Sequence, residues 1–212
     1  MKLVGYFRSS AAYRVRIALN IKGLEVEHDF VQLAKGEQNE PAFATRNPQK
    51  LVPVLEEGPN QLIQSLAILE YLEETHPEPP LLPIEPAARA RVRALAQIVA
   101  CEIHPLNNLR VLAYLTDELG VAEEAKLAWY RHWIAEGLEA LEAVLAASPD
   151  TGRFCHGDRP GLADICLVPQ LFNARRFGCQ MSAFPTLLRI DSECGSLSAF
   201  SHAAPDAQPD AQ

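Results

Sequence analysis

Two adjacent serines stand where a predicted strand passes into a predicted helix. The segment Arg8-Ser9-Ser10-Ala11 follows the strand-like residues 2–7, and apolar residues at helical spacing begin at Ala12. A serine at a helix start commonly accepts a hydrogen bond from a free backbone N–H, and the sequence alone favours this capping interpretation. The alternative is chemical, because a helix N-terminus and a hydroxyl together stabilise a bound anion such as a thiolate.

A proline inside a strand-like run is the second signal. Residues 51–55 read LVPVL, and a trans proline at position 53 would interrupt strand pairing. A cis Val52-Pro53 bond would resolve this conflict and would present the Val52 backbone to an extended peptide, in the manner of an added strand. An edge strand with a trans proline explains the sequence equally well.

Gln64 and Ser65 stand at the start of a second predicted helix. They follow a short strand predicted at 61–63, and the helix runs through Tyr71 and Leu72. The N–H groups at such a start suit a carboxylate. An ordinary N-cap is the competing interpretation.

A compact α/β domain must position these residues. Its predicted order is β-α-β, an irregular segment, then β-β-α, and it occupies residues 1–80. The first helix is predicted to end at Gly23, and Gly58-Pro59-Asn60 is the predicted turn between the last two strands. The strands are predicted at 2–7, 25–31, 51–55 and 61–63.

A proline-rich linker between Pro77 and Pro86 marks the predicted domain boundary. From there on, residues 87–212 form the second domain, which is predicted to be all-helical because apolar residues recur at helical spacing. These runs lie at 92–99, 111–119, 134–145 and 162–169. The tail after Phe200 is predicted to be poorly ordered unless it packs against a domain.

Composition narrows the classes of function. The net charge of −8 is spread evenly, so no basic face for nucleic acid is expected. No apolar run approaches the roughly 18 residues of a membrane span and no secretory leader is recognisable, so a cytoplasmic protein is expected. The five cysteines and six histidines show no metal-ligand spacing, so the thiols are expected to be reduced and no metal site is expected.

Six segments, in this order over nearly the whole chain, resemble the zeta class of glutathione transferases. They are RSSAAYRVRIALNIKG, NPQKLVPVL, IQSLAILEYLEE, IHPLNNLR, GLADICLVPQ and AAPDAQPD. The resemblance implies a thioredoxin-like α/β N-terminal domain, an all-α C-terminal domain, bound glutathione and a homodimer. It also implies cis-trans isomerisation of a small dianionic diketo acid, maleylpyruvate or maleylacetoacetate, in the breakdown of aromatic compounds.

The resemblance assigns roles to particular residues. Ser9 would hydrogen-bond the glutathione thiolate with Ser10 beside it, Val52 would bind the cysteinyl backbone, and Gln64 with Ser65 would bind the γ-glutamyl carboxylate. Further positions that match residues near glutathione in this family are Ala11, Gln38, Gln49, His104, Asn108 and Arg110. The sequence departs from the family at two positions. Ala11 replaces a frequent cysteine, so catalysis would rest on Ser9. Gly161 replaces a serine or threonine N-cap, so the helix cap that it forms with Asp164 is expected to be slightly weaker.

Arginines are expected to bind the dianion, because a guanidinium pairs with a carboxylate through two hydrogen bonds. By resemblance, Arg8, Arg110 and Arg176 contact the substrate, and Arg176 also assists catalysis. From the sequence alone, the favoured explanation for Arg110 and Arg176 is that they lie on solvated helix surfaces. Arg175 is expected to form a salt bridge instead, and Pro105 is expected to kink a long helix.

Two other functions fit the same pattern. The thiolate could serve a glutathione transferase or a dehalogenase of small α-halo acids, and the fold could serve a non-catalytic dimeric binding module. Retention of Ser9, Val52-Pro53 and Gln64-Ser65 together argues against the binding module, which has no need of all three.

Overall fold

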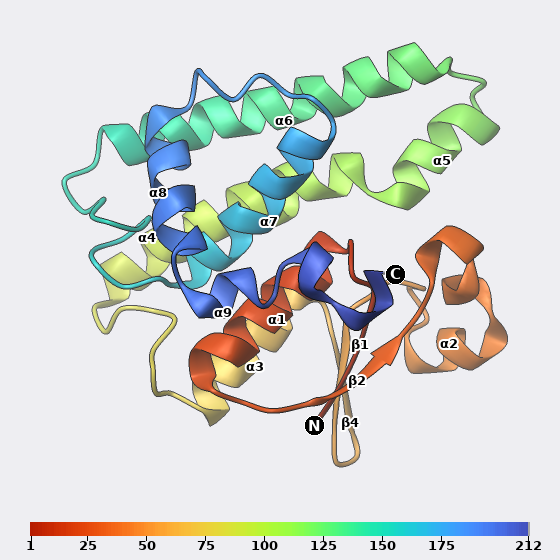
Figure 1. Ribbon diagram of the computed structural model, residues 1–212, viewed down its shortest axis with the longest axis horizontal. Helices are drawn as coiled ribbons and strands as arrows, with labels where there is room; N and C mark the ends of the chain where they lie inside the picture. The colour runs from red at the N-terminus through yellow and green to blue at the C-terminus, as the bar shows by residue number, and fades with distance from the viewer. Residues whose placement is uncertain (212) are drawn as a thin grey trace. The chain divides into compact units, whose positions relative to one another are not determined.

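The computed structural model describes residues 1–211, and the chain divides into two compact units. The first comprises Met1–Leu81 together with the segment from Gly195 onward, and the second comprises Leu82–Cys194 (Figure 1). The break after Leu81 falls within the proline-rich linker. The C-terminal segment, which the sequence analysis assigned to the helical domain, packs with the first unit instead.

A four-stranded sheet forms the centre of the first unit. The strand order is β2-β1-β3-β4, with β1 parallel to β2 and antiparallel to β3, and with β3 antiparallel to β4. The strands are β1 Lys2–Gly5, β2 Glu27–Phe30, β3 Val54–Glu57 and β4 Asn60–Ile63. The third strand starts later than predicted, immediately after Pro53, which has no N–H to donate to a ladder.

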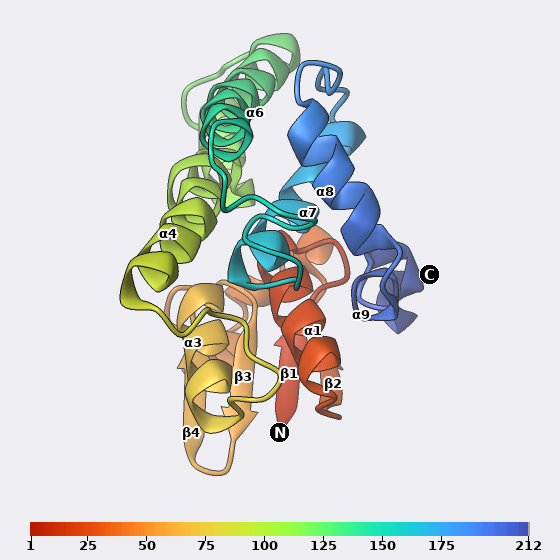
Figure 2. The same cartoon turned by 90° about the vertical axis from the view of Figure 1, so that its left-hand side faces the viewer.

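Two helices lie side by side against this sheet, α1 (Ser10–Lys22) and α3 (Ser65–Thr75) (Figure 2). The first ends at Gly23 as predicted, and the positive φ of 64° at that glycine is the left-handed conformation that commonly ends a helix. The segment expected to be irregular contains a short helix, α2 (Pro41–Arg46), preceded by two 3₁₀ turns at Leu33–Lys35 and Glu37–Asn39.

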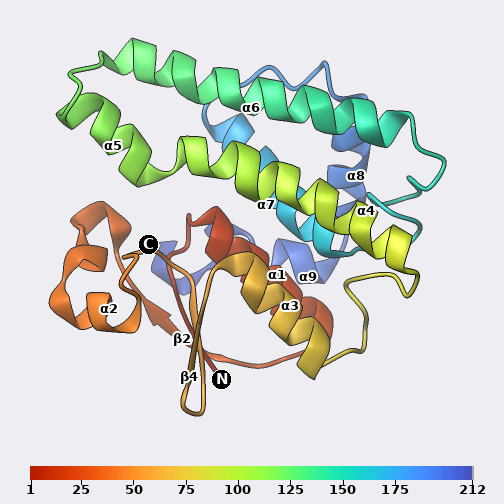
Figure 3. The ribbon, with the colours of Figure 1, turned by 180° about the vertical axis from the view of Figure 1, so that it is seen from behind.

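The second unit is helical, as predicted. Its elements are α4 Pro86–Gln97, α5 Leu109–Asp117, α6 Glu123–Ala146, α7 Leu162–Arg176 and α8 Pro185–Gly195. Figure 3 shows α4 and α5 in succession, with α6 running back beside them. Between α4 and α5 the chain forms a π-helical turn at Ile98–Ile103 and a 3₁₀ turn at His104–Asn107, which contains Pro105. The regular α-helix therefore ends at Gln97, before the proline at which the sequence predicts a kink. Leu119, expected on a helix, lies beyond the end of α5 and is exposed.

The start of α7 depends on a buried carboxylate. Asp164 accepts hydrogen bonds from Gly161 N at 2.9 Å and from Cys155 N at 2.8 Å, and its side chain is fully buried. Gly161 has no side chain with which to cap the helix, so Asp164 supplies the cap and also holds the preceding loop. Burial raises the pKa of Asp164, and the two N–H donors oppose that rise.

The C-terminal segment is ordered because it packs against α1. A short helix, α9 (Ser198–Ser201), is followed by 3₁₀ turns at Pro205–Ala207 and Pro209–Ala211. The Tyr13 hydroxyl donates to the Phe200 carbonyl at 3.3 Å. This meets the condition under which the sequence analysis expected the tail to be ordered.

Candidate active site

The strand register places three chain segments at one edge of the sheet. Val54, the first residue of β3, pairs with Val4 near the end of β1 and with Ile63 at the end of β4. The residues after β1, before β3 and after β4 therefore emerge on the same side. Ser9 follows β1 and Gln64 follows β4. Because β2 is parallel to β1, the segment that carries Gln38 also leaves the sheet at this edge.

Ser9 caps α1, as the favoured interpretation predicted. Its Oγ accepts a hydrogen bond from Ala12 N at 3.2 Å, and its own N–H donates to the Tyr6 carbonyl at 3.0 Å. Accepting from Ala12 leaves the hydroxyl proton of Ser9 able to donate. The capping and the chemical interpretations are therefore compatible. Ser10 is the first helical residue and is buried, and Ala11 is half-buried beside it.

The peptide bond between Val52 and Pro53 is cis, so the cis interpretation of this segment is correct and the trans one is wrong. The Val52 side chain is buried in an apolar cluster that includes Val4 and Tyr6. Asn47 holds the preceding loop, since its Nδ2 donates to the Leu51 carbonyl at 2.7 Å. The backbone at Val52 is thereby fixed from both sides.

Gln64 has a positive φ of 69°, which is uncommon for a residue other than glycine and directs attention to function. Within the described part of the chain its side chain caps no N–H of α3, so the capping interpretation is wrong for Gln64. Its Nε2 donates to Gln49 Oε1 at 2.7 Å instead. Ser65 is buried, and its Oγ accepts from Arg14 Nη1 at 3.2 Å.

Two buried arginines on α1 lie next to these residues, and sequence reasoning missed them. Arg14 reaches Ser65, as described above, and Arg16 donates to the carbonyls of Tyr6, Phe7 and Ala203. Burial lowers the pKa of Arg16 to about 10, which still leaves a cation at neutral pH. The available signal was the pattern of α1 itself, because a helix without a polar face is buried all round.

The side chain of Gln38 has an unused acceptor. Its Oε1 is buried and accepts no hydrogen bond from any of residues 1–211. A buried acceptor without a partner costs free energy, so such an atom marks a position where a ligand donor fits.

Arg8 is held in place by aromatic residues. Its Nη2 donates to the Tyr6 hydroxyl at 2.7 Å, and its Cζ lies 4.9 Å from the centroid of the Phe7 ring. This packing fixes a cation directly before Ser9.

The remaining predicted site residues belong to the second unit. Asn108 caps α5 by accepting from Arg110 N at 3.2 Å, and Arg110 is exposed in the first turn of that helix. Arg176 ends α7 with its Cζ 5.0 Å from the Phe177 ring centroid. Neighbouring Arg175 forms the predicted salt bridge, with Asp191 at 2.5 Å. His104 begins the 3₁₀ turn that precedes Asn108. The ligand contacts assigned to His104, Asn108, Arg110 and Arg176 stay predictions.

Comparison with known proteins decides the family. Residues 1–74 match the glutathione S-transferase N-terminal domain, and residues 128–199 match the C-terminal domain of the same family. A protein of Vibrio cholerae named probable maleylacetoacetate isomerase is 54% identical over 211 residues, which are 99% of this chain and 97% of that protein. A holo structure of maleyl pyruvate isomerase, a bacterial glutathione-S-transferase of the zeta class, matches with a TM-score of 0.98 at 50% identity over 100% of both chains. This chain belongs to the zeta class of glutathione transferases.

A further similar structure carries ligands. Maleylacetoacetate isomerase from Anaeromyxobacter dehalogenans 2CP-1 is 46% identical with a TM-score of 0.88, and the match covers 100% of this chain and 93% of that one. It was solved with dicarboxyethyl glutathione and citrate in its active site. These comparisons confirm the family resemblance and the two-domain fold class inferred from the sequence.

Residues 1–211 show neither a metal-binding cluster nor a membrane-spanning helix. In that range no three His, Cys, Asp or Glu side chains gather in a way that could hold a metal ion. Over the same residues, every helix is too short or too polar to cross a membrane.

Proposed function

We propose that this protein is a glutathione-dependent cis-trans isomerase that converts maleylpyruvate or maleylacetoacetate to its fumaryl isomer. The observation that carries the proposal is the Ser9 hydroxyl, which caps α1 and keeps a proton to donate, at the sheet edge shared with Val52 and Gln64. The names of the relatives over nearly full-length matches support the same reaction.

The first unit offers complementary groups for glutathione. The Val52 backbone, fixed before cis-Pro53, suits an extended cysteinyl residue that pairs like an added strand. The N-terminus of α3, with Ser65 and Gln64, suits the γ-glutamyl carboxylate, and the buried Arg14 adds positive charge there. Gln38 and Gln49 supply further amide groups for the same peptide, with the unpartnered Oε1 of Gln38 ready to accept from an N–H.

Bound glutathione supplies a thiolate, and its reversible addition to the cis alkene gives a single bond about which the substrate can rotate before the thiolate leaves. The Ser9 hydroxyl donates a hydrogen bond to the thiolate sulfur and keeps its proton, and the α1 N-terminus favours negative charge at the same point. Because position 11 is alanine, Ser9 performs this task without a neighbouring thiol. Ser10 supports the same helix start.

Arg8, Arg110 and Arg176 bind the two carboxylates of the substrate and the enolate oxygen on which charge develops. The dicarboxyethyl glutathione in the active site of the Anaeromyxobacter structure supports a dianionic substrate, because this ligand is a glutathione that bears two added carboxylates. His104 and Asn108 complete the set of polar residues assigned to the ligands.

The protein is further proposed to act as a homodimer in the cytoplasm. Family membership supports the dimer, and light scattering that returned the mass of one 23.4 kDa chain would contradict it.

The direct test supplies each candidate substrate with and without glutathione and follows the fumaryl product. Conversion that requires glutathione is expected, and the ratio of kcat/KM values then names the substrate. If neither substrate is converted while glutathione still binds, the isomerase proposal is wrong and conjugation or dehalogenation of small α-halo acids takes its place.

A further inference from the structure

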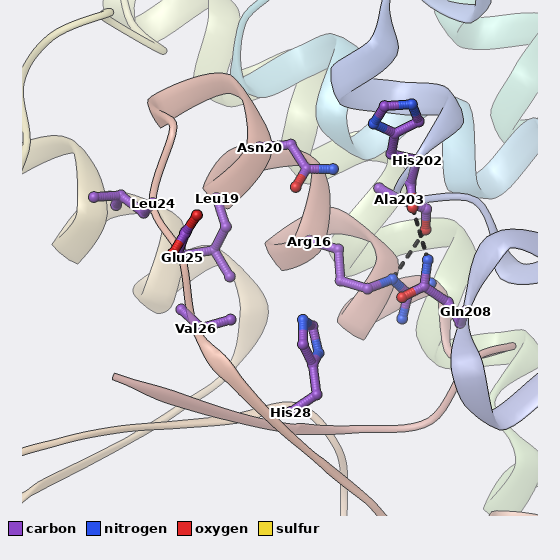
Figure 4. A pocket seen from close by; sticks show the side chains of 10 residues that line it. All are labelled: Arg16, Leu19, Asn20, Leu24, Glu25, Val26, His28, His202, Ala203 and Gln208. Carbon is purple, nitrogen blue, oxygen red and sulfur yellow. Dashed lines mark hydrogen bonds between the residues drawn. The ribbon is translucent and has the colours of Figure 1, made fainter.

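The C-terminal segment meets α1 and β2 around a polar pocket of about 360 Å³ (Figure 4). Arg16 extends from α1 into this region, and Gln208 approaches from the C-terminal segment. The Arg16 Nε donates to the Ala203 carbonyl at 2.9 Å. One buried guanidinium therefore ties α1 to a residue that is nearly two hundred positions away in the sequence.

The same guanidinium also holds the loop that leads to Ser9. Arg16 Nη2 donates to the Phe7 carbonyl at 2.9 Å, and Nη1 lies 3.5 Å from the Tyr6 carbonyl. The Tyr6 carbonyl is also the acceptor for Ser9 N. The carbonyl groups directly before the Arg8-Ser9 pair are thus fixed by a residue of the helix that Ser9 caps.

Asp210 holds the other side of Phe7. Its Oδ2 accepts from Phe7 N at 2.9 Å, across 203 positions of sequence. Its Oδ1 is buried and accepts no hydrogen bond from residues 1–211. The N–H and the C=O of Phe7, two residues before Ser9, are therefore both bound by side chains, Asp210 and Arg16 respectively.

Gln208 gives the segment a defined shape. Its side chain is buried, and Nε2 donates to the carbonyls of His202 at 2.8 Å and Ala204 at 3.0 Å. These bonds turn the chain back on itself between α9 and the last 3₁₀ turn. The carboxylate of Asp210 is consequently presented to Phe7 by a folded segment.

We infer that Asp210 is a positioning residue for the reaction, acting with Arg16 to hold the Phe7 backbone and thereby the orientation of the Ser9 hydroxyl and the Arg8 guanidinium. This role rests on the proposed function of Ser9. It assigns the C-terminal segment to the catalytic machinery of the first unit, although no atom of the segment needs to contact the ligands.

Asp210→Ala removes the acceptor, and two matched variants isolate its effect. Asp210→Asn keeps one acceptor oxygen for Phe7 N and loses the charge. Asp206→Ala removes an exposed carboxylate from the same segment. The readouts are amide hydrogen exchange at Phe7 in the ligand-free protein, the pKa of the thiol of bound glutathione, and steady-state kinetics.

For Asp210→Ala we expect amide exchange at Phe7 to become about tenfold faster and kcat to fall about tenfold. The pKa of the thiol of bound glutathione should rise. Substrate KM should change less, and Asp210→Asn and Asp206→Ala should resemble the parent. Unchanged exchange in Asp210→Ala would overturn the contact, and faster exchange with unchanged kcat and thiol pKa would overturn the positioning role. If Ser9→Ala also leaves the thiol pKa unchanged, the role of Ser9 in the proposed function is wrong. Amide exchange at Phe7 tests the Asp210 contact independently of that role.

Discussion

Ser9 can take part in two hydrogen bonds at once. Its Oγ accepts from a backbone N–H of α1, and its hydroxyl can donate to the ligand. Because Oγ accepts from Ala12 N, the fold sets the position of this oxygen before any ligand binds. Donors that are oriented in advance stabilise developing charge without reorganising during the reaction. At the scale of single residues, the same atom is therefore a structural cap and the leading candidate for thiolate stabilisation.

The arginines of the second unit allow a prediction at this scale. Arg110→Ala or Arg176→Ala should raise KM for the dianionic substrate roughly tenfold, because each loses a charged hydrogen-bond donor to a carboxylate. KM for a neutral thiol acceptor should change much less. Steady-state kinetics with both substrates provides the measurement.

Arg175→Ala is the matched control, since its guanidinium pairs with Asp191. Its KM for the dianion should match that of the parent protein. If Arg176→Ala raises KM equally for the dianion and for the neutral acceptor, then the assignment of Arg176 to the carboxylates is wrong.

The helices and loops contribute specific backbone hydrogen bonds, and the start of α7 is the strongest example. Asp164→Ala would leave the N–H groups of Gly161 and Cys155 without their acceptor in a buried place. We expect the free energy of unfolding to fall by roughly 3 kcal/mol. Urea denaturation measures this loss.

Asp158→Ala is the comparison for that variant, because Asp158 also accepts from a backbone N–H, that of Arg153, but on an exposed part of the chain. Its loss should be well under half of that for Asp164→Ala, because water can satisfy the exposed N–H group. Equal losses in the two variants would show that burial of Asp164 does not govern its contribution.

The elements that carry the predicted site could be located from the sequence because their signals are local. Gly23 ends α1, Ser9 caps it, and Pro53 immediately precedes β3, each as a residue type with its own backbone preference. The sequence could not decide between cis and trans at Pro53, because both isomers are compatible with an X-Pro bond.

The contacts that hold the site together could not be predicted in this way. Arg16 looks like a surface residue by type, and Asp210 lies in a segment whose composition is typical of a mobile tail. Their partners are distant in sequence, so no periodicity or spacing marks them. For the same reason, the sequence predicts that the C-terminal segment belongs to the helical domain, whereas it packs in the first unit.

The whole molecule buries several ionisable groups in their neutral form. Burial raises the pKa of the Cys155 and Cys194 thiols and of the Tyr130 hydroxyl above their ordinary values. Cys155, Cys166 and Cys194 are buried, as expected of small apolar residues, whereas Cys101 is exposed. The free energy of unfolding should therefore fall as the pH becomes alkaline.

In the unfolded chain these thiols ionise near pH 8.5, while in the folded chain they stay protonated. The folded state then binds more protons, so the free energy of unfolding should decrease above about pH 8.5, by up to about 1.4 kcal/mol per pH unit for each thiol. Urea denaturation between about pH 8 and 10, the range in which an unfolded thiol ionises, measures this dependence of the free energy of unfolding on pH. Cys194→Ala should reduce it and Cys101→Ala should leave it unchanged; equal slopes in all three proteins would contradict the prediction.

The most direct test of the account is the pKa of the thiol of glutathione bound to the protein, followed by the ultraviolet absorbance of its thiolate. In the parent protein the pKa should lie below about 7.5, compared with about 8.5 for a free cysteine thiol. Ser9→Ala should raise it by about one unit or more, and Ser9→Thr, which keeps the hydroxyl, should restore much of the shift. A bound thiol that titrates near 8.5 in the parent protein, or one unaffected by Ser9→Ala, would contradict the role given to Ser9.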